Sequence, residues 1–155
     1  MTDPRHLFQD VLLDHYRHPR HTAPLSRPLV VVEQAHRACG DRVRVELSLD
    51  EAARVVPAIL TRGCAVSTAA GSLLAEWVAG RDAGQALEGL NMFRDALEHG
   101  RLPRQAPPPA LAFRSIHAFP VRRGCALLPL EALARALARV AEPPVAPRAR
   151  RQDNI

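Results

Sequence analysis

The sequence contains no lysine, although it carries 21 basic side chains and a formal net charge of +5. Because every one of those side chains is arginine, the protein cannot form a lysine Schiff base or use a lysine as a general base. Arginine also favours planar, bidentate contacts with carboxylates and phosphates. The accompanying abundance of alanine and proline favours a second explanation, namely a genome whose codon usage enriches all three residue types.

Aromatic residues and long apolar runs are also scarce. Only 4% of the residues are aromatic while 47% are hydrophobic, so aliphatic side chains and alanine must build the core. A length of 155 residues suits one compact domain. No apolar run approaches the length of a membrane span, and the segment 1–14 lacks the apolar stretch of a signal peptide. We therefore expect a cytoplasmic protein with no membrane partner.

Cysteine is scarce too, and the three cysteines present form no CxxC pair. An odd number of thiols leaves one unpaired in any disulfide scheme, and a reducing cytosol disfavours disulfides altogether. Each cysteine has a glycine beside it and arginines nearby. The cysteines are Cys39, Cys64 and Cys125, and the adjoining glycines are Gly40, Gly63 and Gly124. Three soft ligands and the nearby carboxylate of Asp41 would complete a tetrahedral metal site, whereas the alternative is three ordinary buried cysteines.

Hydrophobic periodicity predicts an α+β fold. The expected elements, in order, are a helix over 3–17, strands over 29–35, 43–49 and 55–61, a helix over 66–78, helical pieces over 83–87 and 90–99, a proline-rich connection over 100–109 and a last helix over 127–140. Pro57 predicts that the third strand lies at a sheet edge, since proline cannot donate to the ladder. We expect a small three-stranded antiparallel sheet with helices packed on one face, in a domain over 1–140. The Pro- and Arg-rich segment 141–155 is expected to be a disordered tail.

These elements place each cysteine where one element gives way to the next. Cys39 falls in the turn between the first two strands, Cys64 where the third strand enters a helix, and Cys125 just before the last helix. Backbone N–H groups at helix starts, and arginines nearby, favour the anionic thiolate form. The pattern therefore favours one shared metal or catalytic site over three separate core positions.

The three cysteine segments together resemble the signature segments of the IscU/NifU-like family of iron–sulfur cluster assembly proteins. The segments are Ala38-Cys39-Gly40-Asp41, Gly63-Cys64-Ala65-Val66-Ser67 and Gly124-Cys125-Ala126. Further matches are Asp14-His15-Tyr16-Arg17-His18-Pro19-Arg20 near the N-terminus and Gly80-Arg81-Asp82 after the central helix. The resemblance spans most of the chain and leaves out only the tail.

Within this family the chain resembles the SufU branch. In the scaffold branch a histidine directly precedes the third cysteine, whereas this chain has Gly124 there and an interval of 61 positions from Cys64 to Cys125. The approach Phe119-Pro120-Val121-Arg122 is also similar to that of SufU. Two departures from the branch are Gly124, where a basic residue is usual, and Pro129, where an aromatic residue is common.

The resemblance implies a zinc-dependent sulfurtransferase acting in iron–sulfur cluster assembly. It implies a Zn²⁺ ion held by four ligands, which are Cys39, Asp41, Cys64 and Cys125. It also implies that Cys39 accepts persulfide sulfur from a SufS-type cysteine desulfurase and passes it to a downstream assembly scaffold. Arg122 is the second candidate catalytic residue, through contact with the mobile sulfur or with the partner.

Two other functions remain open at this point. A scaffold would assemble a transient iron–sulfur cluster on the same cysteines, and the missing histidine before Cys125 argues against it. A basic, zinc-stabilised module would bind nucleic acid. Its positive charge is dispersed and aromatic stacking residues are few, so we expect no nucleic-acid partner.

The histidines suggest two further features. His36 and His117 lie near cysteines in the sequence and are alternative metal ligands, although no spacing demands them. His15, His18 and His21 cluster at the end of the first helix. Because their spacing only partly shares one helical face, we expect them on a solvated surface rather than in a second metal site.

Overall fold

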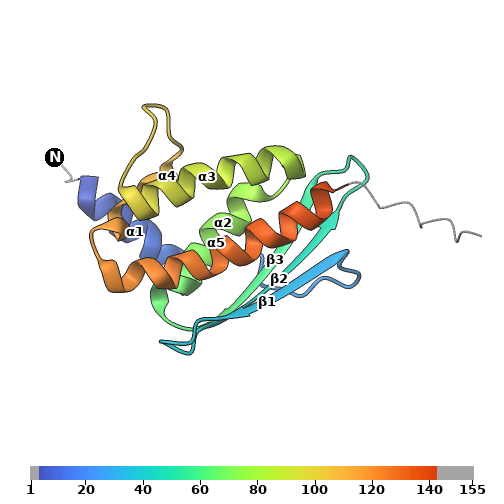
Figure 1. Ribbon diagram of the computed structural model, residues 1–155, viewed down its shortest axis with the longest axis horizontal. Helices are drawn as coiled ribbons and strands as arrows, with labels where there is room; N and C mark the ends of the chain where they lie inside the picture. Colours follow the sequence, from blue (N-terminus) through green and yellow to red (C-terminus); the bar gives the residue numbers. More distant parts are fainter. Residues whose placement is uncertain (1–3, 143–155) are drawn as a thin grey trace, which may run out of the picture.

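The computed structural model describes residues 4–142, in which one helix is followed by three consecutive strands and then by four helices. The elements are α1 (Pro4–Arg17), β1 (Val30–Ala35), β2 (Arg42–Leu49), β3 (Val55–Arg62), α2 (Ala65–Val78), α3 (Ala83–His99), α4 (Pro108–His117) and α5 (Pro120–Ala141). The strands form one antiparallel sheet and the helices gather on one side of it (Figure 1). The predicted α+β class, with a three-stranded sheet covered on one face, is confirmed.

The sheet has the order β1-β2-β3, so the chain builds it as two successive hairpins. Its register places Val32 opposite Val45 and Val45 opposite Ile59, so that alternate apolar residues of all three strands share one face. All three of these side chains are buried. The opposite face carries charged residues such as Glu33 and Arg44, which form an ion pair of 2.6 Å. One face of the sheet therefore belongs to the core, and the other carries charged residues and meets solvent except at the buried pair Glu46 and Ala58.

Pro57 fits into β3 because β3 is an edge strand, as the sequence predicts. The backbone N–H groups of Val55 and Ile59 point away from β2 and donate to carbonyls outside the sheet. The acceptors are Arg81 O, at 2.9 Å, and His21 O, at 2.8 Å. Pro57 lies midway between the two donors and has the same orientation, since alternate residues of a strand share it. Its missing N–H therefore costs no ladder hydrogen bond.

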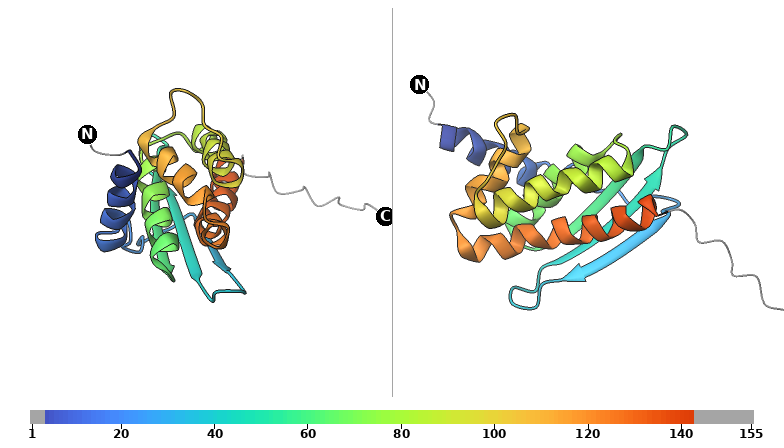
Figure 2. Two further views of the ribbon diagram at one scale, coloured as in Figure 1. Left: turned by 90° about the vertical axis from the view of Figure 1, so that its left-hand side faces the viewer. Right: turned by 45° about the horizontal axis from the view of Figure 1, so that its top comes forward.

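The helices cover the apolar face of the sheet in two parts. α2 packs on β3, and α5 packs on β1 and β2, while α1, α3 and α4 pack on these two helices (Figure 2). The buried side chains at the centre are mostly leucine, valine and alanine, which agrees with the low aromatic content. Within residues 4–142, no helix combines the length and the apolar character needed to cross a bilayer.

The helical layer corrects the sequence-based prediction in three places. α3 is one continuous helix rather than two pieces, α4 was not predicted, and α5 begins at Pro120 rather than near residue 127. Proline opens both α4 and α5, at a position where its missing N–H is not needed. The prolines at the start of α4 had suggested a connecting segment in the sequence. The predicted tail lies outside the described residues from 143 onward, and the domain boundary at 140 stays a prediction.

Three aromatic rings link α2, α3 and α4. Trp77 packs edge-on against Phe93 with ring centroids 5.0 Å apart, and Phe93 packs in the same way against Phe113 at 5.2 Å. The Trp77 ring also lies directly over Gly89 of α3, where a Cβ atom would overlap it. This close approach explains why glycine occupies a position inside α3, since any side chain there would collide with the Trp77 ring.

We predict that Gly89→Ala destabilises the protein although alanine is the better helix former. The added methyl group displaces Trp77, and such overpacking costs about 1–3 kcal/mol of unfolding free energy. Gly84→Ala, in the first turn of the same helix, is the matched control, because its Cβ would meet only the Asp82 carboxylate, at 3.2 Å. Urea denaturation followed by circular dichroism measures both variants. Equal stability of the two variants would contradict the packing described here.

Candidate metal centre

Cys39 lies at the tip of the β1–β2 hairpin, in the loop over 37–40, as predicted. Two backbone hydrogen bonds of 2.8 Å close the loop, from His36 N–H to Asp41 O and from Gly40 N–H to His36 O. Gly40 has a φ of +75°, which glycine adopts without the penalty that a Cβ atom brings. The loop leaves Cys39 exposed, whereas Asp41 beside it is 5% exposed.

Cys64 caps the N-terminus of α2, in agreement with its predicted place between strand and helix. Its thiol accepts a hydrogen bond from the backbone N–H of Ser67 at 3.5 Å, as a serine or aspartate side chain does at other helix starts. The fully buried Ser67 hydroxyl donates to the Cys64 carbonyl at 3.0 Å. The Cys64 sulfur therefore lies at the positive end of the α2 dipole.

Asp41 joins the hairpin to the start of α2. The Cys64 N–H donates to Asp41 Oδ2 at 3.3 Å, and Gly63 passes so close that a Cβ there would lie 2.7 Å from Oδ1. Burial acts to raise the pKa of the Asp41 carboxyl, but hydrogen bonds, chiefly from the Cys64 N–H and the Ser67 hydroxyl, hold it below its ordinary value. Asp41 is therefore an anionic carboxylate at neutral pH, the form that binds a metal ion.

Cys125 lies inside α5, which corrects the prediction that it precedes the last helix. Only 6% of its surface is exposed. Burial raises the pKa of the Cys125 thiol to about 12, and the neighbouring Cys64 thiol adds to the rise. Without a metal ion Cys125 is therefore a neutral thiol at physiological pH. A bound cation would ionise it, since a thiol that coordinates a metal loses its proton.

The fold brings the predicted ligands together at one end of the sheet. The ligand atoms of Cys39, Asp41 and Cys125 all lie within 4.8 Å of one another. Cys64 is outside this trio, but its backbone N–H donates to the Asp41 carboxylate. Its thiol also helps to raise the pKa of the Cys125 thiol. Donor atoms on one tetrahedral zinc ion are about 3.6 Å apart, so the trio is close to the spacing that one ion requires. Thiols and a carboxylate are also donors that zinc accepts.

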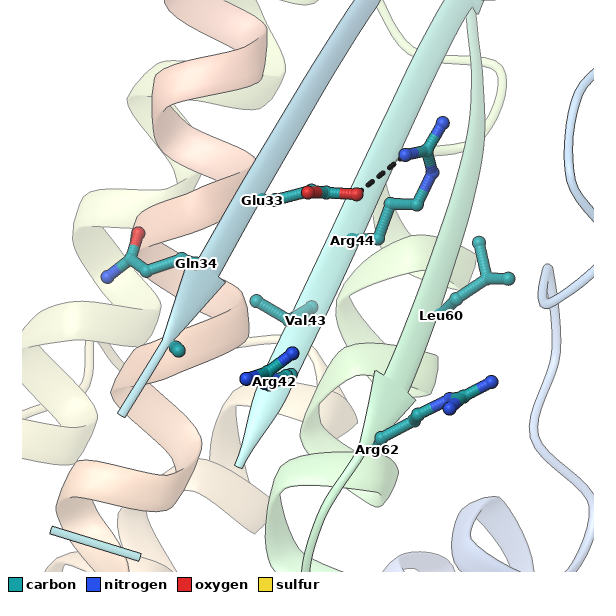
Figure 3. Close-up of a pocket in the computed structure, with 8 residues that line it drawn as sticks. Glu33, Gln34, Arg42, Val43, Arg44, Leu60 and Arg62 are labelled. Carbon is teal, nitrogen blue, oxygen red and sulfur yellow. Dashed lines mark hydrogen bonds and ion pairs between the residues drawn. The ribbon is translucent and has the colours of Figure 1, made fainter. Parts of the chain in front are cut away.

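Arginines lie close in the sequence to three of the proposed ligands. Arg42 and Arg62 face each other at the ends of β2 and β3, next in sequence to Asp41 and Gly63. Both line an open pocket of ≈ 480 Å³ on the charged face of the sheet, whose lining includes none of the cysteines (Figure 3). Arg122 is exposed in the first turn of α5, three positions before Cys125. These side chains place positive charge around a centre whose ligands are anionic when a metal is bound.

The predicted surface cluster of histidines is only partly confirmed. His18 and His21 are exposed, but His15 is buried, with Nδ1 2.7 Å from Ser72 Oγ and Nε2 3.3 Å from the Glu76 carboxylate. Burial lowers the pKa of the His15 imidazole. The prediction was wrong for His15 because the packing of α1 on α2 buries this side chain, which contacts Ser72 and Glu76 of α2.

Two further residues lie beside the site: Ser67, which the sequence analysis did not assign, and His36, which it named only as an alternative ligand. Ser67 supports both Cys64 and Asp41, and its signal in the sequence is the spacing of a cap residue and its partner three positions later. His36 Nδ1 lies 3.2 Å from the Cys39 sulfur. Its only signal is that it precedes Cys39 by three positions, which does not by itself indicate contact.

The geometry can be compared with proteins that are already known. Residues 7–138, which include all four predicted ligands, match the family described as the NifU-like N terminal domain. The chain belongs to this family. The family prediction is thereby confirmed, and SufU is among the relatives that match.

Three relatives illustrate the family. The chain is 28% identical over 134 residues to the zinc-dependent sulfurtransferase SufU of Bacillus subtilis (strain 168), covering 86% of this chain and 90% of that protein. It is also 28% identical over 137 residues to the iron–sulfur cluster assembly scaffold protein IscU of Streptococcus pyogenes serotype M1, covering 88% and 86%. The crystal structure of FiSufU from Fervidobacterium islandicum AW-1 shares the fold, with a TM-score of 0.75 and 22% identity over 87% of this chain and 99% of that one. The NifU-like family is thus one of iron–sulfur cluster assembly.

We predict that the three thiols of the metal-free protein react with iodoacetamide in the order of their exposure. At about pH 8, Cys39 reacts first and Cys125 last, more than about tenfold more slowly, because only the thiolate attacks and Cys125 is buried with a raised pKa. Raising the pH toward 12 ionises Cys125 and reduces the difference between its alkylation rate and that of Cys39. Mass-spectrometric peptide mapping over time gives the three rates. Equal rates for Cys39 and Cys125 in the folded protein would show that the site is arranged differently.

Proposed function

We propose that the protein is a zinc-dependent sulfurtransferase that accepts persulfide sulfur from a cysteine desulfurase, of SufS type, and relays it to an iron–sulfur assembly scaffold. The observation that carries the proposal is the unequal exposure of three thiols gathered near one carboxylate. Cys39 is exposed, Cys64 is half-buried and Cys125 is buried. The name of the Bacillus subtilis relative supports the choice of zinc and of sulfur transfer.

Asp41, Cys64 and Cys125 are the proposed anchors for Zn²⁺. Asp41 is already a carboxylate, Cys64 lies at a helix N-terminus, and Cys125 is held by α5. When bound, Zn²⁺ keeps thiols in the anionic form and takes no part in redox chemistry, so it does not consume a persulfide. Cys39 differs from these anchors because it lies on an exposed hairpin loop, so it is the ligand free to move.

Cys39 is the proposed sulfur acceptor. Its thiolate attacks the outer sulfur of a persulfide on the desulfurase cysteine, so that an S–S bond forms on Cys39 while the donor S–S bond breaks. The electron pair of the broken bond leaves on the donor cysteine as a thiolate, and the proton of the persulfide stays with the transferred sulfur. Because one persulfide replaces another, the exchange needs no outside oxidant or reductant.

A scaffold that assembles an iron–sulfur cluster on the same side chains is the second candidate. The name of the Streptococcus pyogenes relative favours it. Against it, Gly124 stands directly before Cys125, so this chain offers no side-chain ligand at that position. The relay is therefore the function that the residues support better.

We expect the purified protein to bind about one zinc ion per chain, as a closed tetrahedral site does, and to stimulate alanine release by its cognate desulfurase. Metal analysis and an alanine assay measure the two quantities. Cys39→Ser should abolish the stimulation, and mass spectrometry should find the persulfide on Cys39 of the unsubstituted chain. Iron, sulfide and a visible chromophore in place of zinc would favour the scaffold. Zinc without any stimulation would refute the relay.

Arg122 is proposed to contact the mobile sulfur or the desulfurase. Its first-turn position on α5 leaves the guanidinium exposed, on the same helix as Cys125. We expect Arg122→Ala to lower the transfer rate by about tenfold, the value of one hydrogen bond to a charged group, without changing the zinc content. Arg114→Ala, an exposed arginine on α4, is the control. Full transfer activity in Arg122→Ala would remove this residue from the mechanism.

A further inference from the structure

The charged face of the sheet carries two rows of side chains that cross all three strands. The antiparallel register aligns Glu33, Arg44 and Leu60 in one row, and Ala35, Arg42 and Arg62 in the other. These six residues alternate along their strands, so they share one face, and all of them line the open pocket of Figure 3. The second row lies at the end of the sheet next to the candidate metal centre, because Arg42 directly follows Asp41.

The two rows differ in how their arginines are paired. In the first row Arg44 donates to the Glu33 carboxylate at 2.6 Å and to the Glu46 carboxylate at 2.7 Å, so its charge is compensated within the sheet. In the second row Arg42 lies directly opposite Arg62. Among the side chains that the structure describes, neither of these two has a carboxylate within ion-pair distance. The second row therefore presents two exposed and uncompensated guanidinium groups.

The second row does not serve the stability of the sheet. Like charges directly opposite each other on antiparallel strands are destabilising. Guanidinium groups bind carboxylates in planar, bidentate pairs, and arginine is enriched among the residues that contribute most to protein interfaces. A carboxylate brought by another protein would supply the compensation that the sheet itself lacks.

We propose that Arg42 and Arg62 dock an acidic segment of the cysteine desulfurase beside Cys39. The inference rests on the proposed sulfur relay, in which the desulfurase brings its persulfide to Cys39 at the tip of the β1–β2 hairpin. Arg42 follows Cys39 by three positions, so their Cα atoms are at most about 11 Å apart. A specific interface covers about 800 Å² per partner, a patch of about 16 Å radius, so a partner centred on Cys39 is large enough to reach Arg42 and the Arg62 opposite it.

The surroundings of the two arginines favour a protein carboxylate over a nucleic acid. Tight binding to nucleic acid needs many phosphate contacts, whereas this row offers two guanidinium groups. The exposed Glu33 carboxylate of the neighbouring row also disfavours a phosphate chain that extends along the face. A short acidic segment needs only the two positive charges, and Ala35 and Leu60 give the same pocket an apolar part for its other side chains.

The first test compares double variants in the alanine-release assay. Arg42→Ala/Arg62→Ala should raise the concentration that half-saturates the desulfurase by about fivefold to tenfold, because each exposed ion pair contributes a few-fold. The rate at saturation and the zinc content should match those of the unsubstituted chain. Added salt should weaken the unsubstituted chain more than the variant, since salt screens exposed charges. The control is Arg54→Ala/Arg114→Ala, which removes two exposed arginines outside the pocket.

The absence of lysine from the sequence permits a second and more direct test. In Arg62→Lys the new amine is the only side-chain amine of the chain, and a carbodiimide joins an amine to a carboxylate only where the two are in contact. Mass spectrometry of the treated complex should find this amine coupled to an aspartate or glutamate of the desulfurase. Arg114→Lys, with its amine on α4, is the matched control and should give no such product.

The outcomes separate the docking surface from the relay. An unchanged half-saturating concentration in Arg42→Ala/Arg62→Ala, or equal coupling in Arg62→Lys and Arg114→Lys, would overturn the docking surface and leave the relay standing. Binding of RNA or duplex DNA that is lost in Arg42→Ala/Arg62→Ala, with desulfurase stimulation unchanged, would assign the two arginines to nucleic acid and also overturn it. A lack of any stimulation by the unsubstituted chain would instead overturn the relay.

Discussion

The candidate site depends on one close approach, between the Asp41 carboxylate and the backbone of Gly63. The two residues lie directly beyond the last pair of the β2–β3 ladder, and the carboxylate fills the space that a side chain at Gly63 would occupy. That contact holds the hairpin tip against the start of α2, so Cys39 and Cys64 come near each other. Cys125 then reaches the same place because α5 crosses β1 and β2 and begins early. A hairpin, a strand-to-helix junction and a long helix thereby converge on one carboxylate.

Much of this arrangement was predictable from local patterns. The alternation of apolar residues along β2 and the helical spacing along α2 give the α+β class, and they place Cys39 and Cys64 correctly. The start of α5 was not predictable in this way. The segment Pro120–Gly124 has no apolar stripe and contains residues typical of turns, and its helical state depends on the continuation of the helix and on packing. The sequence-based prediction therefore placed Cys125 before the last helix rather than inside it, although it did assign Cys125 to the same site as the other two cysteines.

The neighbours of the site were harder to foresee than its proposed ligands. Nothing in the sequence says that His36 faces Gly124, because that contact depends on how the hairpin loop meets α5. The same is true of His15, whose burial follows from the packing of α1 on α2. Thiols and carboxylates are recognisable by type, whereas the groups that orient them are identified only by where the fold puts them. The three thiols likewise differ in exposure because of where the fold places them, which the sequence pattern does not show.

The edge of β3 has a consequence for the behaviour of the protein in concentrated solution. Edge strands with free donors and acceptors invite another chain to pair with them, which leads to aggregation or strand exchange. At three successive outward positions β3 offers no free N–H group, because Val55 and Ile59 donate to the protein's own carbonyls and Pro57 has no donor. This edge therefore resists extension by a neighbouring strand.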